Sequence, residues 1–171
     1  LTFANTGAAP LPVRLIVDTS SSTTGGFSID LQSAVPSVPG DSCARLDAPI
    51  TSDVALTSED FTGYVNDYTA TGQVVCKYGA GPDRAYAVTV PAGKVLTATA
   101  TPNGLLPDGG TLDLTLSVMA AGANCSAGPC LAGADTTGTA ETLRFSNFPG
   151  DGGAQEVVLI VDSKVADATL Y

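Results

Sequence analysis

Apolar and polar residues alternate with a period of two through several segments of the chain. The alternation is clearest at 85–90 (AYAVTV), 95–101 (VLTATAT) and 112–119 (LDLTLSVM). It is typical of half-buried β-strands, in which successive side chains point to opposite faces of a sheet. No segment shows a persuasive helical period of 3.6 residues. The pattern therefore predicts an all-β protein.

Turn-forming residues separate these segments from further strand-like ones. The run VVLIV from Val157 to Val161 is continuous and apolar, which predicts a central strand covered on both faces. About eight strands at this spacing predict an antiparallel β-sandwich with a jelly-roll-like topology. The additional strands are expected at 54–56, 61–68, 143–148, 156–162 and 168–171.

An internal repeat links the two ends of the chain. Residues 1–5 read LTFAN, and residues 143–147 read LRFSN. Downstream, residues 13–19 read VRLIVDT, and residues 157–163 read VVLIVDS. The offset is 142 residues for the first pair and 144 for the second, which a two-residue loop insertion reconciles. We expect each copy to form a strand, a turn and a second strand.

The repeat predicts how the chain is organised. Residues 43–171 are expected to form a nearly complete β-sandwich. Residues 1–32 are expected to be the last strands of a preceding repeat, excised from something longer, or strands donated to a neighbouring subunit. Residues 33–42 (SAVPSVPGDS) contain two prolines and a glycine, which predicts a short extended linker.

Part of the second copy resembles a known family. The segment DRAYAVTVPAGKVLTATATP at 83–102, the Leu-x-Leu strand at 112–118 and the late strand pair within 141–163 carry the resemblance. They are similar to the bacterial pre-peptidase C-terminal (PPC) domain, in the variants repeated in large secreted bacterial proteins. The resemblance implies a β-sandwich that is commonly appended to secreted proteases and has no catalytic residues.

The chain has four cysteines and no histidine. An even number of cysteines in a secreted-looking composition predicts two disulfides and an extracellular or cell-surface location. The short spacing of Cys125 and Cys130 favours a local bridge, which leaves Cys43 to pair with Cys76. A zinc site is the alternative, although no CxxC pair is present. The longest apolar runs are shorter than 18 residues, which predicts no membrane span.

The charge of the chain excludes two classes of partner. The net charge is −10, and the seven Lys and Arg residues form no cluster that could neutralise nucleic-acid phosphates or bind an anionic membrane. Catalysis is also disfavoured, because a nucleophile needs a base beside it and the chain has no histidine. Lys77 and Lys94 lie in turn-like sequence, which gives a serine–lysine dyad no support. We expect a protein that is not an enzyme.

Calcium is the one metal worth considering, and otherwise no cofactor is expected. Asp108, Asp113 and Asp151 lie in loops whose backbone carbonyls could supply further oxygen ligands. The sequence has no twelve-residue EF-hand pattern. The alternative interpretation is that these aspartates and the adjacent glycines form turns.

The first functional hypothesis is structural. Strands donated by residues 1–32 would join this chain to itself or to neighbouring repeats through main-chain hydrogen bonds, as in an extracellular fibre or adhesin. Without a partner, these strands would expose unpaired backbone and bare apolar side chains. The expected assembly residues are Phe3, Leu15, Ile16, Val17, Phe27, Ile29 and Leu31.

The second hypothesis is a calcium- or carbohydrate-binding accessory domain of a secreted bacterial enzyme. Tyrosine rings can form a platform on which sugars stack, although ordinary packing in the core or on a strand face is the simpler interpretation. The chain has no tryptophan, which weakens the sugar hypothesis. The tyrosines in question are Tyr64, Tyr68, Tyr78 and Tyr86.

Overall fold

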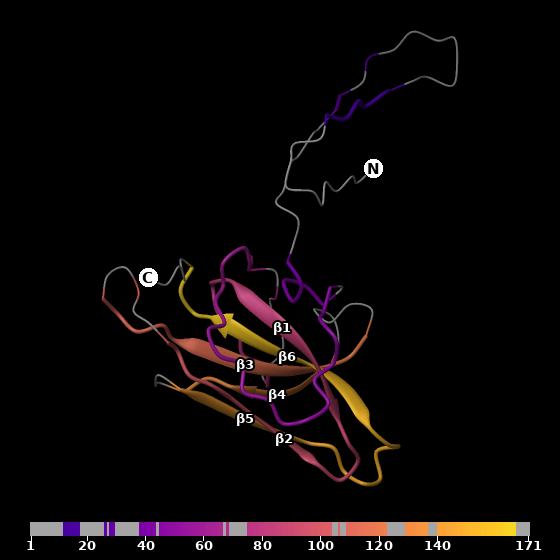
Figure 1. Ribbon diagram of the computed structural model, residues 1–171, viewed down its shortest axis with the longest axis vertical. Helices are drawn as coiled ribbons and strands as arrows, with labels where there is room; N and C mark the ends of the chain where they lie inside the picture. The colour runs from indigo at the N-terminus through magenta and orange to yellow at the C-terminus, as the bar shows by residue number, and fades with distance from the viewer. Residues whose placement is uncertain are drawn as a thin grey trace. The chain divides into compact units, whose positions relative to one another are not determined.

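The chain divides into two compact units, Leu1–Pro36 and Ser37–Tyr171. The division falls inside the segment 33–42 that was expected to be a linker. The second unit contains every strand of the described residues (Figure 1). The computed structural model describes residues 12–17, 26, 28–29, 38–43, 45–66, 68, 75–103, 106, 109–122, 129–136 and 140–166.

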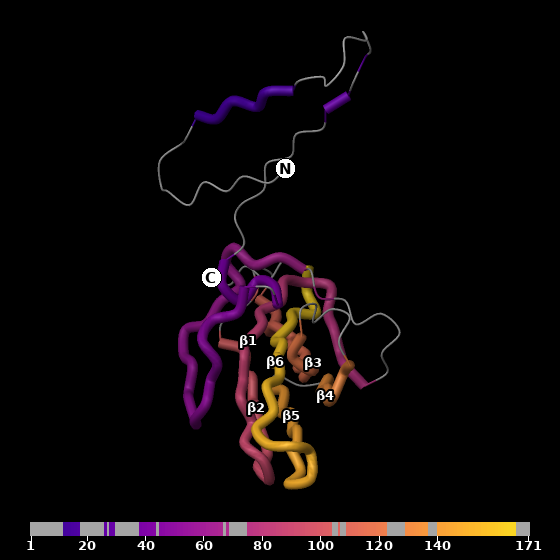
Figure 2. The backbone as a smooth tube through the Cα atoms, turned by 90° about the vertical axis from the view of Figure 1, so that its right-hand side faces the viewer, coloured from indigo at the N-terminus to yellow at the C-terminus, as the bar shows by residue number. Residues whose placement is uncertain are grey.

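Six strands form two antiparallel sheets in the described part of the second unit. The larger sheet has the order β1-β6-β3-β4, and the smaller has β2 beside β5 (Figures 1 and 2). This confirms the expected all-β sandwich. The described residues contain no helix, and hence none that could cross a membrane. The strands are β1 (Asp83–Val90), β2 (Val95–Ala100), β3 (Leu114–Ala120), β4 (Cys130–Ala134), β5 (Glu141–Ser146) and β6 (Gln155–Ser163).

β6 lies at the centre of the larger sheet, as its apolar run predicted. Val158 lies opposite Ala87 of β1 on one side and opposite Met119 of β3 on the other. Val157 and Val158 are both buried, although neighbouring residues of a strand point to opposite faces. The larger sheet is therefore covered on both faces at β6, which confirms the prediction of a central strand.

Two cores cover the two faces of the larger sheet. The core between the sheets joins Val88, Leu116 and Val157 of the larger sheet to Leu143 of the smaller. The other face is covered by segments that precede β1 in the sequence. This second core consists of Tyr68, Cys76, Ala85, Met119, Val158 and Ile160.

A disulfide joins Cys76 to Cys130, 54 residues later, at the start of β4. This finding corrects the expected pairs, Cys125 with Cys130 and Cys43 with Cys76. Sequence proximity favoured the local bridge, but the pairing of β4 with β3 brings Cys130 against the core that contains Cys76. Cys43 is also disulfide-bonded, and Cys125 lies outside the described residues.

Some segments with strand-like sequence are not strands. Residues 54–56 and the described part of 61–68 are irregular. They run past the sheets and do not join a hydrogen-bonded ladder. Residues 12–17 are likewise described without strand structure. The strand expected at 168–171 lies outside the described residues. β4 was not expected, because its sequence CLAGA is short, small and without alternation.

The second half of the expected linker packs on the β-sandwich. The carbonyl of Gly40 accepts a hydrogen bond from the Ala85 N–H at 2.7 Å. The buried carboxylate of Asp41 accepts one from the Val65 N–H at 2.8 Å. Gly40 has a φ of 86°, and an added Cβ would lie 2.9 Å from the Ala85 carbonyl oxygen. Residues 38–42 are therefore part of the packed domain.

Candidate binding groove

The two sheets are joined along one side of the sandwich. β4 of the larger sheet contacts β5 of the smaller sheet (Figure 1). The buried carboxylate of Glu141, at the start of β5, accepts hydrogen bonds from the N–H and the hydroxyl of Thr136 at 3.0 and 2.8 Å. β1 and β2 are the edge strands of the opposite side. Because the smaller sheet has two strands and the larger has four, the smaller sheet leaves part of the larger one without a strand above it.

The edge of β1 is covered by the chain itself. Backbone groups of Gly40, Ile50 and Val65 bond to it. Ile50 makes two bonds of 2.9 Å, because its N–H donates to the Ala87 carbonyl and its carbonyl accepts from the Thr89 N–H. Covering a sheet edge in this way prevents pairing with other chains.

The described residues leave the edge of β2 open. On the side that faces β5, the Asn147 N–H donates to the Lys94 carbonyl at 3.0 Å. Along an antiparallel pair, every second residue bonds to the partner strand and the residues between them point their backbone groups away. Because Lys94 bonds to the β5 side, the even-numbered residues of β2 are the ones that bond to β5. The odd-numbered residues, Thr97 and Thr99 among them, direct their N–H and C=O groups to the other side. No strand of the described residues lies there.

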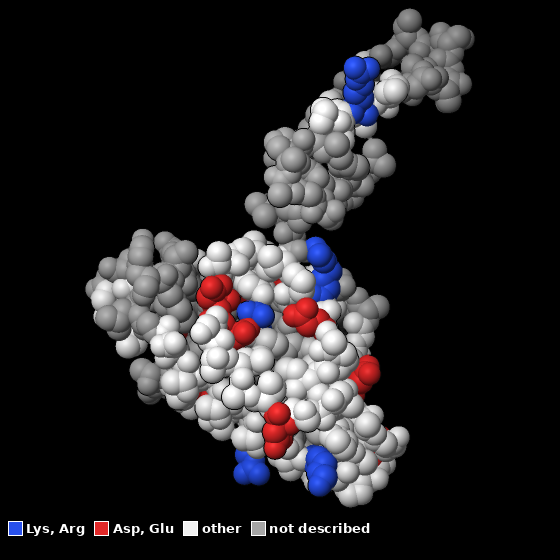
Figure 3. All heavy atoms as spheres, in the orientation of Figure 1, with Lys and Arg blue, Asp and Glu red and all other residues white. Residues whose placement is uncertain are grey.

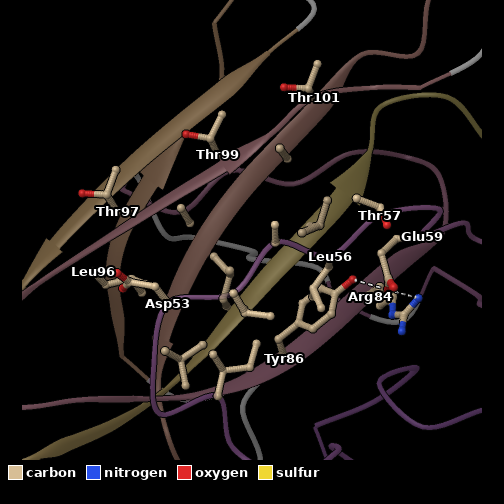
Figure 4. A pocket seen from close by; sticks show the side chains of 18 of the residues that line it. Asp53, Leu56, Thr57, Glu59, Arg84, Tyr86, Leu96, Thr97, Thr99 and Thr101 are labelled. Carbon is tan, nitrogen blue, oxygen red and sulfur yellow. Dashed lines mark hydrogen bonds and ion pairs between the residues drawn. The ribbon is translucent and has the colours of Figure 1, made fainter.

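A groove with a volume of about 1130 Å³ lies beside this open edge. Its floor is the inner face of the larger sheet, and its far wall is the segment that follows Ile50. Figure 4 shows Thr97, Thr99 and Thr101 along one wall, and Leu56, Thr57, Glu59 and Tyr86 toward the other side. The apolar residues of the floor are Tyr86, Val88, Val90, Leu114, Leu159 and Val161.

Residues 51–58 form a flap that is anchored at its two ends. Ile50 bonds to β1 at one end. At the other end, the Glu59 carboxylate accepts a hydrogen bond from the Tyr86 hydroxyl at 3.0 Å and forms an ion pair with Arg84 (Figure 4). Between these anchors, the flap makes no hydrogen bond to another described residue, and Ser58 has a φ of 61°. Among the described residues, the flap is therefore held by hydrogen bonds at its two ends alone.

The guanidinium of Arg84 lies between two tyrosine rings. Its carbon is 5.0 Å from the ring centre of Tyr64 and 5.1 Å from that of Tyr86, within the range of cation–π attraction. Burial raises the pKa of both phenols, and the charge of Arg84 opposes the rise. The Tyr86 hydroxyl therefore stays protonated and donates to Glu59.

The tyrosines considered as a sugar platform do not share one surface. Tyr64 and Tyr86 each have a ring face against Arg84. Tyr68 is buried in the second core, and burial raises its pKa to about 12. Tyr78 is exposed and follows the disulfide-bonded Cys76.

The aspartates considered as calcium ligands are separated. Asp113 forms an ion pair with Lys164 at 3.2 Å, and the Asp151 carboxylate accepts a hydrogen bond from the Phe148 N–H at 2.9 Å. One lies beside the last residue of β6 and the other precedes its first residue, so about 25–30 Å of strand separates them. The described residues contain no group of three acidic, cysteine or histidine side chains that could hold a metal. Asp108 lies outside the described residues.

The expected assembly residues are partly described. Leu15, Ile16, Val17 and Ile29 are exposed, and Ile16 retains 84% of its accessible surface. Phe3, Phe27 and Leu31 lie outside the described residues.

On the face of the β-sandwich in Figure 3, Lys and Arg appear as separate spots in a largely uncharged surface. The open edge of β2 follows the same pattern, because the sequence VLTATA has no charged residue and no proline. Charged residues and prolines are the usual protection of an exposed edge strand. β2 itself therefore lacks this protection, but the sequence alone does not show that β2 is an edge strand.

No family model, no curated protein and no solved structure matches this chain.

Proposed function

We propose that this chain is a non-catalytic structural module of an extracellular fibre, adhesin or surface array, which self-assembles by β-strand complementation. The observation that carries the proposal is the open edge of β2 beside an apolar groove. An unpaired strand edge recruits a strand from another chain through main-chain hydrogen bonds, and pockets beside it select the side chains. The described residues cover the edge of β1 but leave the edge of β2 for a further strand.

Two further observations support the extracellular part of the proposal. The Cys76–Cys130 disulfide ties β4 to the segment before β1, and such bonds persist in oxidising compartments. The segment 83–102, on which the proposed PPC-like character of a secreted bacterial protein rests, forms β1, a turn and β2. A fibre exposed to the medium benefits from disulfides because they restrict the unfolded chain.

The groups around the groove support a role other than catalysis. Glu59 is engaged with Arg84 and Tyr86, which leaves its carboxylate poorly placed to act as a base. The described cysteines are all disulfide-bonded. The chain has no histidine to activate a serine or threonine.

Sedimentation velocity of the full chain over a wide range of concentrations tests this proposal, with negative-stain electron microscopy of the same samples. We expect oligomers that grow with concentration and filaments with a regular axial repeat. The competing function is a calcium- or carbohydrate-binding accessory domain. Dispersed monomers at every concentration, with a melting temperature that rises on adding calcium or a polysaccharide, would support that function and contradict ours.

A further inference from the structure

We infer that the groove beside β2 accepts residues 13–17 of a second copy of this chain, added as a third strand to the β2–β5 sheet. The inference rests on the proposed function, because it names the two surfaces through which the chain would assemble. The donor and the acceptor are different parts of the chain, so each copy carries one of each.

The donor segment has the composition of a strand and pairs with no strand of the described residues. Residues 12–17 read PVRLIV, and every described side chain in this segment is exposed. In an extended conformation, Val13, Leu15 and Val17 project from one face, and Arg14 and Ile16 from the other. Pro12 lacks an N–H and ends the run that can add to a ladder. Contiguous exposed apolar side chains mark interaction sites, which argues for a partner that covers this segment.

The acceptor is long enough to pair with the whole donor. β2 has six residues, Val95–Ala100, and residues 13–17 are five. A strand added to β2 would lie about 4.8 Å from it and about 10 Å above the larger sheet. Its inward side chains would then meet the apolar floor of the groove at Tyr86, Leu159 and Val161, which are partly exposed. The N–H and C=O groups of Thr97 and Thr99 would gain partners.

Charge also favours this occupant. The flap and the two residues after it, 51–60, carry Asp53, Glu59 and Asp60 and no basic residue. The donor segment carries a single charge, that of Arg14. The groove lining also holds Lys94 and Arg84, which pairs with Glu59, so Asp53 and Asp60 are the acids left for Arg14 among the described residues. Among the described residues the flap is bonded at its ends alone, so admitting the strand would break no hydrogen bond within the flap.

A donor and an acceptor on different surfaces give a head-to-tail contact. Each copy would insert its donor in one neighbour and receive the donor of another. Such a heterologous contact produces an open filament unless its rotation closes a ring. The inference thus accounts for growth beyond a dimer.

Two variants of the full chain test the inference by mixing. Leu15→Asp places a charge in the donor face and leaves the groove intact. Thr97→Pro removes an N–H from the open edge of β2, without removing one that bonds to β5, and leaves the donor intact. We expect each variant to be monomeric where the wild type assembles. We expect an equimolar mixture to give 1:1 heterodimers, because one intact donor and one intact groove remain.

Phe148→Asp is the matched control for adding a charge to an exposed apolar residue, and we expect it to assemble as the wild type does. A peptide of residues 11–18 should shorten wild-type filaments, and the same peptide with Leu15→Asp should not. The peptide experiment uses wild-type protein, so it tests the inference even if Thr97→Pro fails to fold. Assembly of the wild type that neither variant nor peptide disturbs would overturn this inference and leave the proposed function standing. A monomeric wild type would overturn both.

Discussion

Asp83 on β1 lies directly opposite Asp162 on β6, and both side chains are buried. Asp162 accepts a hydrogen bond from the Gly79 N–H at 2.6 Å, and Asp83 accepts one from the Tyr68 N–H at 2.9 Å. Burial raises the pKa of Asp162 to about 7; the charge of Asp83 adds to the rise, and the bond from Gly79 opposes it. Like charges opposite each other in a sheet repel, so the fold is most stable when the pair holds a proton.

This pair predicts a pH dependence of stability. The pKa of Asp162 is about 7 in the folded chain and near 3.8 in the unfolded chain. Between these values the folded state holds a proton that the unfolded state has lost. The contribution of Asp162 to stability is therefore fully present below about pH 4 and is lost as the pH rises to about 7. Asp162→Asn should abolish this dependence and exceed the wild type in stability at pH 8 by about 2–4 kcal/mol.

Urea denaturation from pH 4 to pH 8 measures the effect as the difference between the two proteins. Glu156→Gln changes an exposed carboxylate of the same strand and serves as the control. Parallel stability curves for the wild type and Asp162→Asn would show that Asp162 is not the group responsible.

The disulfide pairing predicts both a peptide map and a stability change. Digestion without reduction should release a peptide pair that joins Cys76 to Cys130, and the remaining two cysteines, Cys43 and Cys125, should appear in the other pair. Removing the first bridge with Cys76→Ser and Cys130→Ser together should destabilise the fold by about 2–5 kcal/mol, because the bridge closes a long loop. A peptide that links Cys125 to Cys130 would contradict the structure.

The close backbone contacts at Gly133 predict that a side chain at this position of β4 would destabilise the fold. An added Cβ would clash with the Val75 carbonyl oxygen and lie 3.0 Å from the Cys76 Cα, so the segment before β1 would have to move. Gly133→Ala should therefore lower the free energy of unfolding by about 1–3 kcal/mol. Gly122→Ala meets nothing within 4 Å and should change it by less than about 0.5 kcal/mol. Equal melting temperatures for the two variants would argue against the close approach of β4.

The anchor at Glu59 predicts the behaviour of the flap. Glu59→Ala removes the ion pair with Arg84 and the hydrogen bond with Tyr86, which frees one end of residues 51–58. Limited proteolysis should cut the flap several-fold faster, while global stability falls by no more than about 1 kcal/mol because the pair is partly exposed. Asp53→Ala, in the middle of the flap, is the matched control. Equal cleavage rates for both variants and the wild type would mean that Glu59 does not hold the flap.

Sequence patterns predicted the strands that obey simple burial rules. Val157–Val161 lies in a strand that is covered on both faces. The alternation in β2 reflects a single inward face, whereas β1 and β3 belong to the sheet that packs against a core on each side. The same rules failed for residues 54–56, because an apolar side chain beside a groove has the same sequence signature as one in a sheet. β4 was not predicted because its sequence does not alternate. Gly133 is needed there because the backbone of Val75 and Cys76 lies close to it, and a pattern of apolar and polar residues does not reveal such a contact.

The candidate site could not be predicted to the same extent. Which strand edge is open depends on the order β1-β6-β3-β4 and on the loops that cover β1, and neither is local in sequence. The prediction of the disulfide pairs was wrong for the same reason, since Cys76 and Cys130 meet through the pairing of β3 with β4. The assembly role of residues 13–17 stays a prediction from their composition; the structure describes them as exposed and without strand structure.

Amide hydrogen exchange in β2 tests the central claim most directly. The N–H groups of Thr97 and Thr99 face the open edge, whereas that of Ala98 faces β5 and provides an internal reference. In dilute monomer, Thr97 and Thr99 should exchange fast and Ala98 slowly. In concentrated, assembled protein, strand addition predicts that Thr97 and Thr99 become as protected as Ala98. Assembled protein in which Thr97 and Thr99 still exchange at the monomer rate would contradict strand complementation at β2.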